Sequence, residues 1–362
     1  MINETKFLGL GGAGSKVVDA LMSVNDLAEG QFLNNNSVEM KSLSNYSPMT
    51  GISIRGSGTG RNREKAKLAV EADSGKIINQ IDNDAGKYTT YVLIFSLDGG
   101  FGSGSFKKVA ELTKGLNKGL GNDVAVNLVG IVPKNAKRIV NIKNTLAAYA
   151  DILDLLDEGI IDSYQLIDNH KMVNESEFNL EVATRLSDAY QINFNELDIN
   201  DARLVNNCPG YKLILDLNPE DEENPLDLKD AVMKSFTESC FLVPRNMGKC
   251  RKLGFSVQEE FYNKEAILDL FYISDFDKED YNEETNIVVL GGMENPFDYF
   301  KELEKRLEEI EAEGDIPDTY RPTINTRPKE KAQEAPTKEK PAAPKKLGRK
   351  ALRDLASSLL NK

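Results

Sequence analysis

Residues 96–105 read SLDGGFGSGS and lie between the apolar run YVLIF (91–95) and the run FKKVAELTK (106–114). The first run has the composition of a buried strand, and the second has the apolar spacing of a helix. Glycine at this density before a helix lets a ligand approach the backbone N–H groups, and the positive end of the helix dipole favours an anion there. The stretch therefore predicts a phosphate-binding turn between a strand and a helix.

The first half of the chain repeats this order of apolar run, turn and helical run. The other pairs are KFLGLG with SKVVDALMSV, VEMKSL with NREKAKLAVEA, and VAVNLVGIVP with IVNIKNTLAAYADILDLL. Such alternation predicts an α/β fold, a parallel sheet with helices on both faces. In such sheets ligands bind at the carboxyl ends of the strands, so the chemistry is expected in these turns.

The rest of the chain predicts three further parts. The run from Asn179 to Ile192 has the spacing of a central helix, and the runs beyond it predict a second, smaller α/β domain that ends in an amphipathic helix. From about Ile316 the chain turns to Pro, Thr, Lys and Glu, which is typical of disorder. We therefore predict a first α/β domain at 1–175, a central helix and loop at 176–210, a C-terminal α/β domain at 211–315 and a disordered basic tail at 316–362.

The 362 residues are 40% hydrophobic and 28% charged, enough for one large or two ordinary folded domains. Their net charge of -13 is unevenly distributed: residues 321–362 carry +8, which leaves -21 for the remainder. A basic tail on an acidic body suggests a negatively charged partner, such as nucleic acid, a membrane surface or an acidic protein. A tail that serves only solubility would have the same charge.

Several classes of protein are disfavoured. No apolar run approaches the roughly 20 residues of a membrane-spanning helix, and the N-terminus MINETKFLGLGG lacks the features of a secretory signal, so a cytoplasmic protein without a membrane span is expected. The three cysteines, Cys208, Cys240 and Cys250, and the single His170 lack zinc-ligand spacing. We predict reduced, structural cysteines and no metal site made of protein side chains.

Two more glycine-rich turns precede helical runs, GLGGAG (9–14) and IRGSGTGRN (54–62). The first fits the dinucleotide fingerprint G-x-G-x-x-G, but the predicted second strand, VEMKSLSNY, ends without the acidic residue that would bind a ribose. The Walker pattern is absent from the sequence. Each turn alone could be no more than a tight connection, whereas three of them on neighbouring strands favour a wrapped triphosphate.

In this order the turns resemble the tubulin and FtsZ superfamily of polymerising GTPases, over roughly residues 6–295. DGGFGSG (98–104) is similar to the family signature G-G-G-T-G-[ST]-G, with Asp98 and Phe101 as departures, GLGGAGSK to its GxGGAGGN and RGSGTGRN to its loop beside the γ-phosphate. LVGIVP and LIDN resemble the turns towards the ribose, and ELDINDARLV (196–205) resembles the catalytic segment N-x-D-F-x-D-V.

The resemblance implies a site in which GTP binds with Mg²⁺ to the domain at 1–175 while two acids, on the segment after the central helix, orient the attacking water. Asp198 and Asp201 would be these catalytic acids. The residues that would bind the nucleotide are Gly11, Gly12, Ala13, Gly14, Lys16, Asn45, Gly58, Thr59, Gly60, Arg61, Asn62, Gly99, Gly100, Phe101, Gly102, Ser103, Pro133, Asn169 and Asn179.

Within the superfamily, VPKNAK, LIDNHKM and LDINDARLVNN are most similar to the plasmid and phage tubulins of the TubZ type, with the phage-spindle tubulins (PhuZ) next. The resemblance implies a GTPase that forms dynamic head-to-tail filaments, hydrolyses GTP at the subunit junction and segregates or positions plasmid or phage DNA. The tail would engage a DNA-bound adaptor or the DNA. Alternatives are a spindle that centres phage DNA or capsids, an FtsZ-like division filament, and a Rossmann-type nucleotide-binding protein that does not polymerise.

Overall fold

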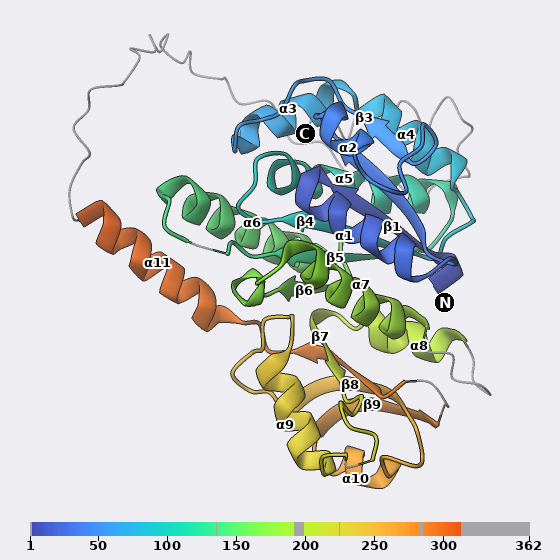
Figure 1. The fold of residues 1–362 in the computed structure, drawn as a ribbon. Helices are drawn as coiled ribbons and strands as arrows, with labels where there is room; N and C mark the ends of the chain where they lie inside the picture. The colour runs from blue at the N-terminus through green and yellow to red at the C-terminus, as the bar shows by residue number, and fades with distance from the viewer. Residues whose placement is uncertain (1, 135, 192–198, 224, 282–284, 313–362) are drawn as a thin grey trace, which may run out of the picture.

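A computed structural model describes residues 2–134, 136–191, 199–223, 225–281 and 285–312, with only the backbone described at 199–202 and 278–281. Ten strands of the described chain form one sheet (Figure 1). They are β1 (Thr5–Leu10), β2 (Glu29–Asn34), β3 (Gly51–Ser53), β4 (Thr90–Ser96), β5 (Ala125–Ile131), β6 (Ser163–Ile167), β7 (Gly210–Asp216), β8 (Lys249–Val257), β9 (Tyr272–Tyr281) and β10 (Ile287–Met293).

The strand order β3-β2-β1-β4-β5-β6-β7-β10-β8-β9 confirms the predicted α/β class. The strands from β3 to β7 are parallel, β10 is antiparallel to both β7 and β8, and β8 is parallel to β9. The carboxyl ends of β1, β2, β4, β5 and β6 therefore lie at one edge. The join between β6 and β7 is short, with Ser163 opposite Gly210 and Tyr164 opposite Tyr211.

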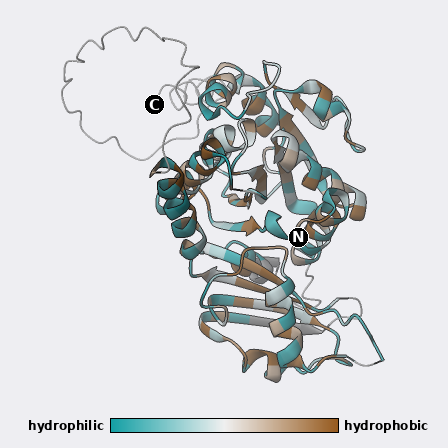
Figure 2. Ribbon diagram, turned by 60° about the vertical axis from the view of Figure 1, so that its left-hand side comes forward, coloured by the Kyte–Doolittle hydropathy of each residue, from teal (hydrophilic) through white to brown (hydrophobic). Residues whose placement is uncertain are grey.

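Helices cover both faces of the parallel strands. They are α1 (Gly11–Val24), α2 (Ser37–Lys41), α3 (Arg63–Ala72), α4 (Ser74–Asn83), α5 (Phe101–Leu120), α6 (Ile139–Asp157), α7 (Glu175–Gln191), α8 (Ile199–Asn206), α9 (Leu228–Glu238), α10 (Lys264–Leu268) and α11 (Phe297–Ala312), with short 3-10 helices η1 (Ile2–Glu4) and η2 (Asn169–Lys171). In Figure 2 the outer helices carry long hydrophilic stretches, as amphipathic helices on a sheet should.

The two faces can be assigned from side chains, because successive residues of a strand point to opposite sides. On β1, Phe7 meets Tyr190 of α7 edge-on, with ring centroids 5.4 Å apart. On β4, Phe95 stacks on Phe106 of α5 at 4.1 Å, and Phe95 pairs with Leu10, which faces away from Phe7. Helices α1 and α7 therefore cover one face, and α5 covers the other. Every residue of β1 is buried between them.

The final helix packs on α6, as its apolar face predicts. Phe300 and Leu303 of α11 are buried, and the Phe300 ring stacks on Tyr149 of α6 with centroids 3.4 Å apart. The predicted reduced cysteines are also confirmed, because all three are free and buried. Among the described residues, no helix is long and apolar enough to span a membrane.

The predicted second strand is wrong. Residues 37–41 of the run that contains VEMKSL form helix α2, because Asn36 caps its first turn by accepting a hydrogen bond from the Glu39 N–H at 3.4 Å. Val38 is 78% exposed, which a central strand would not allow. The second strand is instead EGQFLN (29–34), so Asn45 does not end a strand.

The central helix starts four residues before the predicted Asn179. It begins at Glu175. Glu175 and Glu177 lie in the first turn, where their negative charges interact favourably with the positive end of the helix dipole. Part of the predicted catalytic loop is also helical, as α8.

Candidate functional site

Helix α1 begins directly after β1 and packs against the backbone of its neighbours. A Cβ on Gly9 would lie 2.6 Å from the Ser15 Cα, and one on Gly14 would lie 1.9 Å from the carbonyl oxygen of Ile94 in β4. No side chain fits at either position. Gly11, with φ at +72°, makes the turn from strand to helix. The first glycine turn is thus shaped by contact with the sheet.

Four turns enter helices along the first half of the chain, after β1, β2, β3 and β4; the glycine-rich ones are the first (9–14), the third (56–62) and the fourth (99–104). The fourth turn lies beside the first. A Cβ on Gly102, in the first turn of α5, would lie 2.7 Å from the carbonyl oxygen of Leu10, and one on Gly11 would lie 3.1 Å from the Gly102 nitrogen. The N-termini of α1 and α5 are therefore adjacent at the carboxyl edge of the sheet. Their free N–H groups and dipoles make this place favourable for an anion.

The third turn closes over the fourth. A Cβ on Gly100 would lie 2.1 Å from the Thr59 hydroxyl oxygen and 2.8 Å from the Arg61 nitrogen. Gly58, Gly60 and Arg61 all have positive φ, and Asn62 caps α3 by accepting from the Lys65 N–H at 2.9 Å. The structure therefore brings together the three glycine turns, which we call the glycine cradle (residues 9–14, 56–62 and 99–104).

The carboxylate of the departure Asp98 is held by specific partners. It accepts from Asn141 Nδ2 of α6 at 2.9 Å, from Arg61 at 3.5 Å and from the Ser96 hydroxyl. Phe101, the second departure, is buried in the core. Both side chains are engaged by the protein itself.

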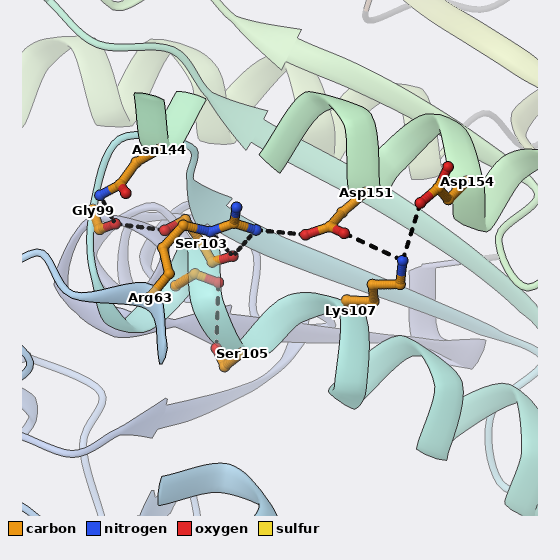
Figure 3. Close-up of polar contacts among 9 residues, drawn as sticks. Arg63, Gly99, Ser103, Ser105, Lys107, Asn144, Asp151 and Asp154 are labelled. Atoms are coloured by element: carbon orange, nitrogen blue, oxygen red, sulfur yellow. Dashed lines mark hydrogen bonds and ion pairs between the residues drawn. The ribbon is translucent and has the colours of Figure 1, made fainter. Parts of the chain in front are cut away.

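Helix α6 supplies a further contact that the sequence interpretation missed. Asn144 Nδ2 donates to the carbonyl oxygens of Arg61 at 2.9 Å, Asp98 at 3.2 Å and Gly99 at 3.1 Å, so one amide joins the third and fourth turns. Figure 3 shows it pointing at Gly99. The sequence did contain a signal for this contact: Asn141 and Asn144 lie three residues apart at the start of α6, so both side chains are on one face of the helix.

Behind the cradle runs a chain of ion pairs (Figure 3). Arg63, the first residue of α3, donates to the Ser103 carbonyl oxygen at 3.0 Å and pairs with Asp151 of α6 at 2.5 Å. Lys107 of α5 contacts Asp151 and Asp154, each at 3.2 Å. Partial burial by itself would lower the pKa of Lys107, but these two carboxylates raise it. These ion pairs hold α3, α5 and α6 together.

The carboxyl end of β2 also contributes residues that were not predicted. A Cβ on Gly12 would lie 1.9 Å from the Glu39 carboxylate, which accepts from Asn34 Nδ2 at 3.0 Å. One on Gly56 would lie 2.9 Å from Asn35 Nδ2. The sequence signal was the run of three asparagines, 34–36, after the apolar residues of β2.

Other predicted residues lie around this edge. Lys16 of α1 pairs with Glu175 of α7 at 2.8 Å, which places the first turns of α7, including Asn179, beside the start of α1. Pro133 follows β5 and Asn169 follows β6. Asn45 instead donates through Nδ2 to the carboxylate (3.1 Å) and carbonyl oxygen (3.0 Å) of Asp19, two turns along α1 from the cradle.

Of the two predicted acids, the structure places only the backbone of Asp201, and it lies elsewhere. Asp198 falls outside the described residues, and of Asp201 only the backbone, in α8, is described. Asn206 of α8 accepts through its carbonyl oxygen from Ser163, the first residue of β6, and Arg203 of α8 pairs with Glu4, which precedes β1. Helix α8 is therefore at the amino ends of the strands, across the sheet from the glycine cradle.

A relative, the tubulin-like protein TubZ of Clostridium botulinum C phage, is 27% identical over 298 residues, which are 81% of this chain and 80% of that protein. The crystal structure of TubZ from Clostridium botulinum phage c-st has a TM-score of 0.73 at 24% identity and covers 87% of this chain and 100% of its own. A GTPγS-form protofilament of TubZ from Bacillus thuringiensis serovar israelensis has a TM-score of 0.68 at 15% identity, with coverage of 86% and 94%. No family model matches the chain.

Proposed function

Because the chain is a tubulin/FtsZ-superfamily protein similar to TubZ, we propose that it is a GTPase that assembles head-to-tail into filaments. The observation that carries the proposal is the placement of two half-sites. The glycine cradle is at the carboxyl edge of the sheet, and α8, which holds Asp201, is at the opposite edge. One molecule cannot join them, whereas two molecules stacked in the same orientation can.

Such a contact does not close on itself, because each subunit offers the same two unlike ends to its neighbours. The polymer would be a filament in which every junction completes a site. Phosphoryl transfer requires mainly the positioning of water and the neutralisation of charge, so a carboxylate supplied across the junction suffices to activate hydrolysis. Asp201 and Asp198 would have this role, and hydrolysis would follow assembly.

Within one subunit, the N–H groups at the starts of α1 and α5 would hold the phosphates, and the third turn would enclose the γ-phosphate. Asn179 and Lys16, near the start of α7, would meet the guanine. Mg²⁺ bound to the phosphates would reduce their negative charge, and Glu39, whose carboxylate lies beside Gly12, fits the oxygen ligands that this ion prefers. The dipoles of the backbone N–H groups at the helix starts would compensate the remaining negative charge.

The first test is assembly itself. On addition of GTP, light scattering should rise, and phosphate release per subunit should increase with protein concentration because each site needs a neighbour. GDP or NADH should give no sustained rise. Light scattering that does not change on addition of GTP, or a turnover per subunit that is independent of protein concentration, would contradict the proposal. Binding of NADH instead of GTP would favour a dinucleotide-binding protein.

We propose further that the filament positions plasmid or phage DNA in the cytoplasm, with the basic tail at 316–362 binding a DNA-bound adaptor or the DNA. The tail lies outside the described residues. Protein truncated at Pro322 should assemble in the same assay but should no longer retain adaptor and DNA in pull-downs. Equal retention by truncated and full-length protein would refute this role for the tail.

Asp98 provides a test of the cradle's electrostatics. Its carboxylate lies in the fourth turn, so Asp98→Asn should tighten GTP binding by removing a negative charge near the phosphates and releasing Arg61 from its pair. An effect on the order of 1 kcal/mol, about fivefold in Kd, is expected at low salt. Titration with a non-hydrolysable GTP analogue measures it. An unchanged or higher Kd would show that the Asp98 carboxylate does not repel the bound phosphates.

A further inference from the structure

Lys212 of β7 is buried in an unusual setting. Its side chain is 1% exposed, and Nζ donates to the Tyr190 hydroxyl at 3.0 Å and to Asn206 Oδ1 at 3.3 Å, while it lies 4.6 Å from the centre of the Tyr190 ring. Among the described residues it makes no ion pair with a carboxylate. Burial lowers the pKa of Lys212 to about 7, because the charged form has lost its water.

Lys212 belongs to a set of contacting polar side chains. Asn127 Nδ2 of β5 donates to the Tyr190 hydroxyl at 3.2 Å and to Asn207 Oδ1 at 2.7 Å. The Ser163 hydroxyl of β6 is 2.9 Å from Asn127 Oδ1 and 3.0 Å from the Asn206 carbonyl oxygen. We call this set the α7–α8 polar cluster: Asn127, Ser163, Tyr190, Asn206, Asn207 and Lys212.

The cluster joins the ends of two helices. Tyr190 lies in the last turn of α7, and Asn206 is the last residue of α8; Asn206 Nδ2 also donates directly to the carbonyl oxygen of Ala189 at 3.1 Å. Lys212 bridges Tyr190 and Asn206 from the strand beneath. The relative placement of α7 and α8 is therefore set by these hydrogen bonds to β5, β6 and β7.

Close packing makes this placement specific. A Cβ on Gly291 of β10 would lie 2.8 Å from the Val205 carbonyl oxygen, and one on Gly254 of β8 would lie 3.1 Å from the Val205 side chain. Helix α8 thus touches the sheet backbone at its own C-terminal end. A change of its angle would break either these contacts or the polar cluster.

The energetics argue for a role beyond stability. Burying an ammonium group costs free energy that two neutral acceptors offset only in part, and a methionine would fill the same space without that cost. The Tyr190 hydroxyl would keep Asn127 as its donor. A stable core does not need the lysine.

We propose that Lys212 is a positioning residue for hydrolysis: by bridging Tyr190 and Asn206 it fixes the orientation of α8, and hence of Asp201, towards the next subunit. The inference rests on the proposed function. Asp201 lies five residues before Asn206, about one and a half turns along the same helix. A small rotation of α8 would therefore move the catalytic group while leaving the glycine cradle at the other edge unchanged.

The test compares Lys212→Met with the parent protein in three measurements. We expect the same Kd for a non-hydrolysable GTP analogue, the same critical concentration for assembly, and a turnover per filament subunit about tenfold lower, since misplacement of a reacting group by about 1 Å can cost about a hundredfold and a smaller shift costs less. The thermal unfolding midpoint should be unchanged or higher. A purely structural lysine would instead lower the midpoint and all activities together.

Lys6→Met is the matched control. Lys6 of β1 is also a buried lysine above a tyrosine, with Nζ 3.5 Å from the Tyr88 hydroxyl and 5.1 Å from its ring centre, but it points to the face opposite Phe7 and α7. Its replacement should leave turnover per filament subunit at the parent value. Equal losses in the two variants would mean that any buried lysine matters, which would overturn the proposal.

Tyr190→Phe removes only one hydroxyl and keeps the test valid if Lys212→Met folds poorly. Combined with Lys212→Met it should add little to the loss of turnover, because both changes break the same bridge. Additive effects, or parental turnover in either single variant, would overturn the inference. If the parent protein itself shows no assembly-dependent turnover, the proposed function fails as well, so the two failures are distinguishable.

Discussion

Filaments of an Asp201→Ala variant are expected to be static: they form with GTP, retain it and do not turn over. Residue 201 belongs to α8, at the amino-end edge of the sheet, so its side chain cannot reach its own cradle and should not affect GTP binding in the same molecule. Loss of a group that orients the attacking water typically costs a hundredfold or more. We expect phosphate release per filament subunit to fall by at least about a hundredfold, with unchanged Kd for a GTP analogue.

Two variants control this prediction. Asp201→Asn keeps the shape of the side chain and removes its charge. If the carboxylate is needed, its phosphate release should be as low as that of Asp201→Ala. Glu265→Ala removes an exposed carboxylate from α10, a helix that carries none of the predicted site residues, and should behave as the parent (Figure 1). Phosphate release and light scattering measured together decide the matter. Parental turnover in Asp201→Ala at high protein concentration would remove Asp201 from the mechanism.

Replacing Gly14 by alanine is expected to damage both the fold and nucleotide binding. The new Cβ would lie 1.9 Å from the carbonyl oxygen of Ile94 and 2.7 Å from its carbon. These atoms belong to the backbone of a strand buried on both faces, which cannot move aside, so α1 must shift outward and away from α5. We expect a loss of about 3 kcal/mol in unfolding free energy and, in the protein that remains folded, at least tenfold weaker GTP binding.

Gly75→Ala is the matched control. Gly75 is in α4, and a Cβ there would meet no atom within 4 Å. Alanine has the higher helix propensity, so this variant should be more stable by about 0.5–1 kcal/mol. Denaturant unfolding of both variants against the parent measures the difference. Similar stabilities for the two variants would show that α1 can adjust to a side chain at position 14.

The three glycine turns could be predicted from the sequence because local rules govern them. Each follows an apolar run and precedes a helical one, and parallel strands then bring their carboxyl ends to one edge without further information. The strand β2 could not be predicted in the same way. Its residues Glu29, Gln31 and Asn34 look unsuited to a buried strand, and Glu29 has its partner far along the chain, in Lys87, which it contacts at 2.8 Å.

Contacts between remote residues account for the parts of the site that were missed. Asn144 joins the third and fourth turns across 83 and 45 residues of sequence, and nothing near it in the chain indicates those partners. The same holds for Lys212. Within YKLILDL it looks like an ordinary polar residue of a strand, and only the tertiary structure shows that Tyr190 of α7 and Asn206 of α8 cover it. The hydrogen-bonding partners of a buried polar side chain are set by tertiary structure.

The packing of α11 on α6 determines where the tail begins. Glu311, near the end of α11, pairs at 2.7 Å with Lys143 of α6, which lies between the two asparagines that hold the third and fourth turns. The end of α11, after which the tail follows, is therefore fixed to the half of the molecule that holds the glycine cradle. In a filament of the proposed kind, one tail would recur at every junction, so a DNA-bound adaptor would meet a regularly spaced, multivalent array. Weak individual contacts would then add up to avidity that appears with polymerisation and vanishes with disassembly.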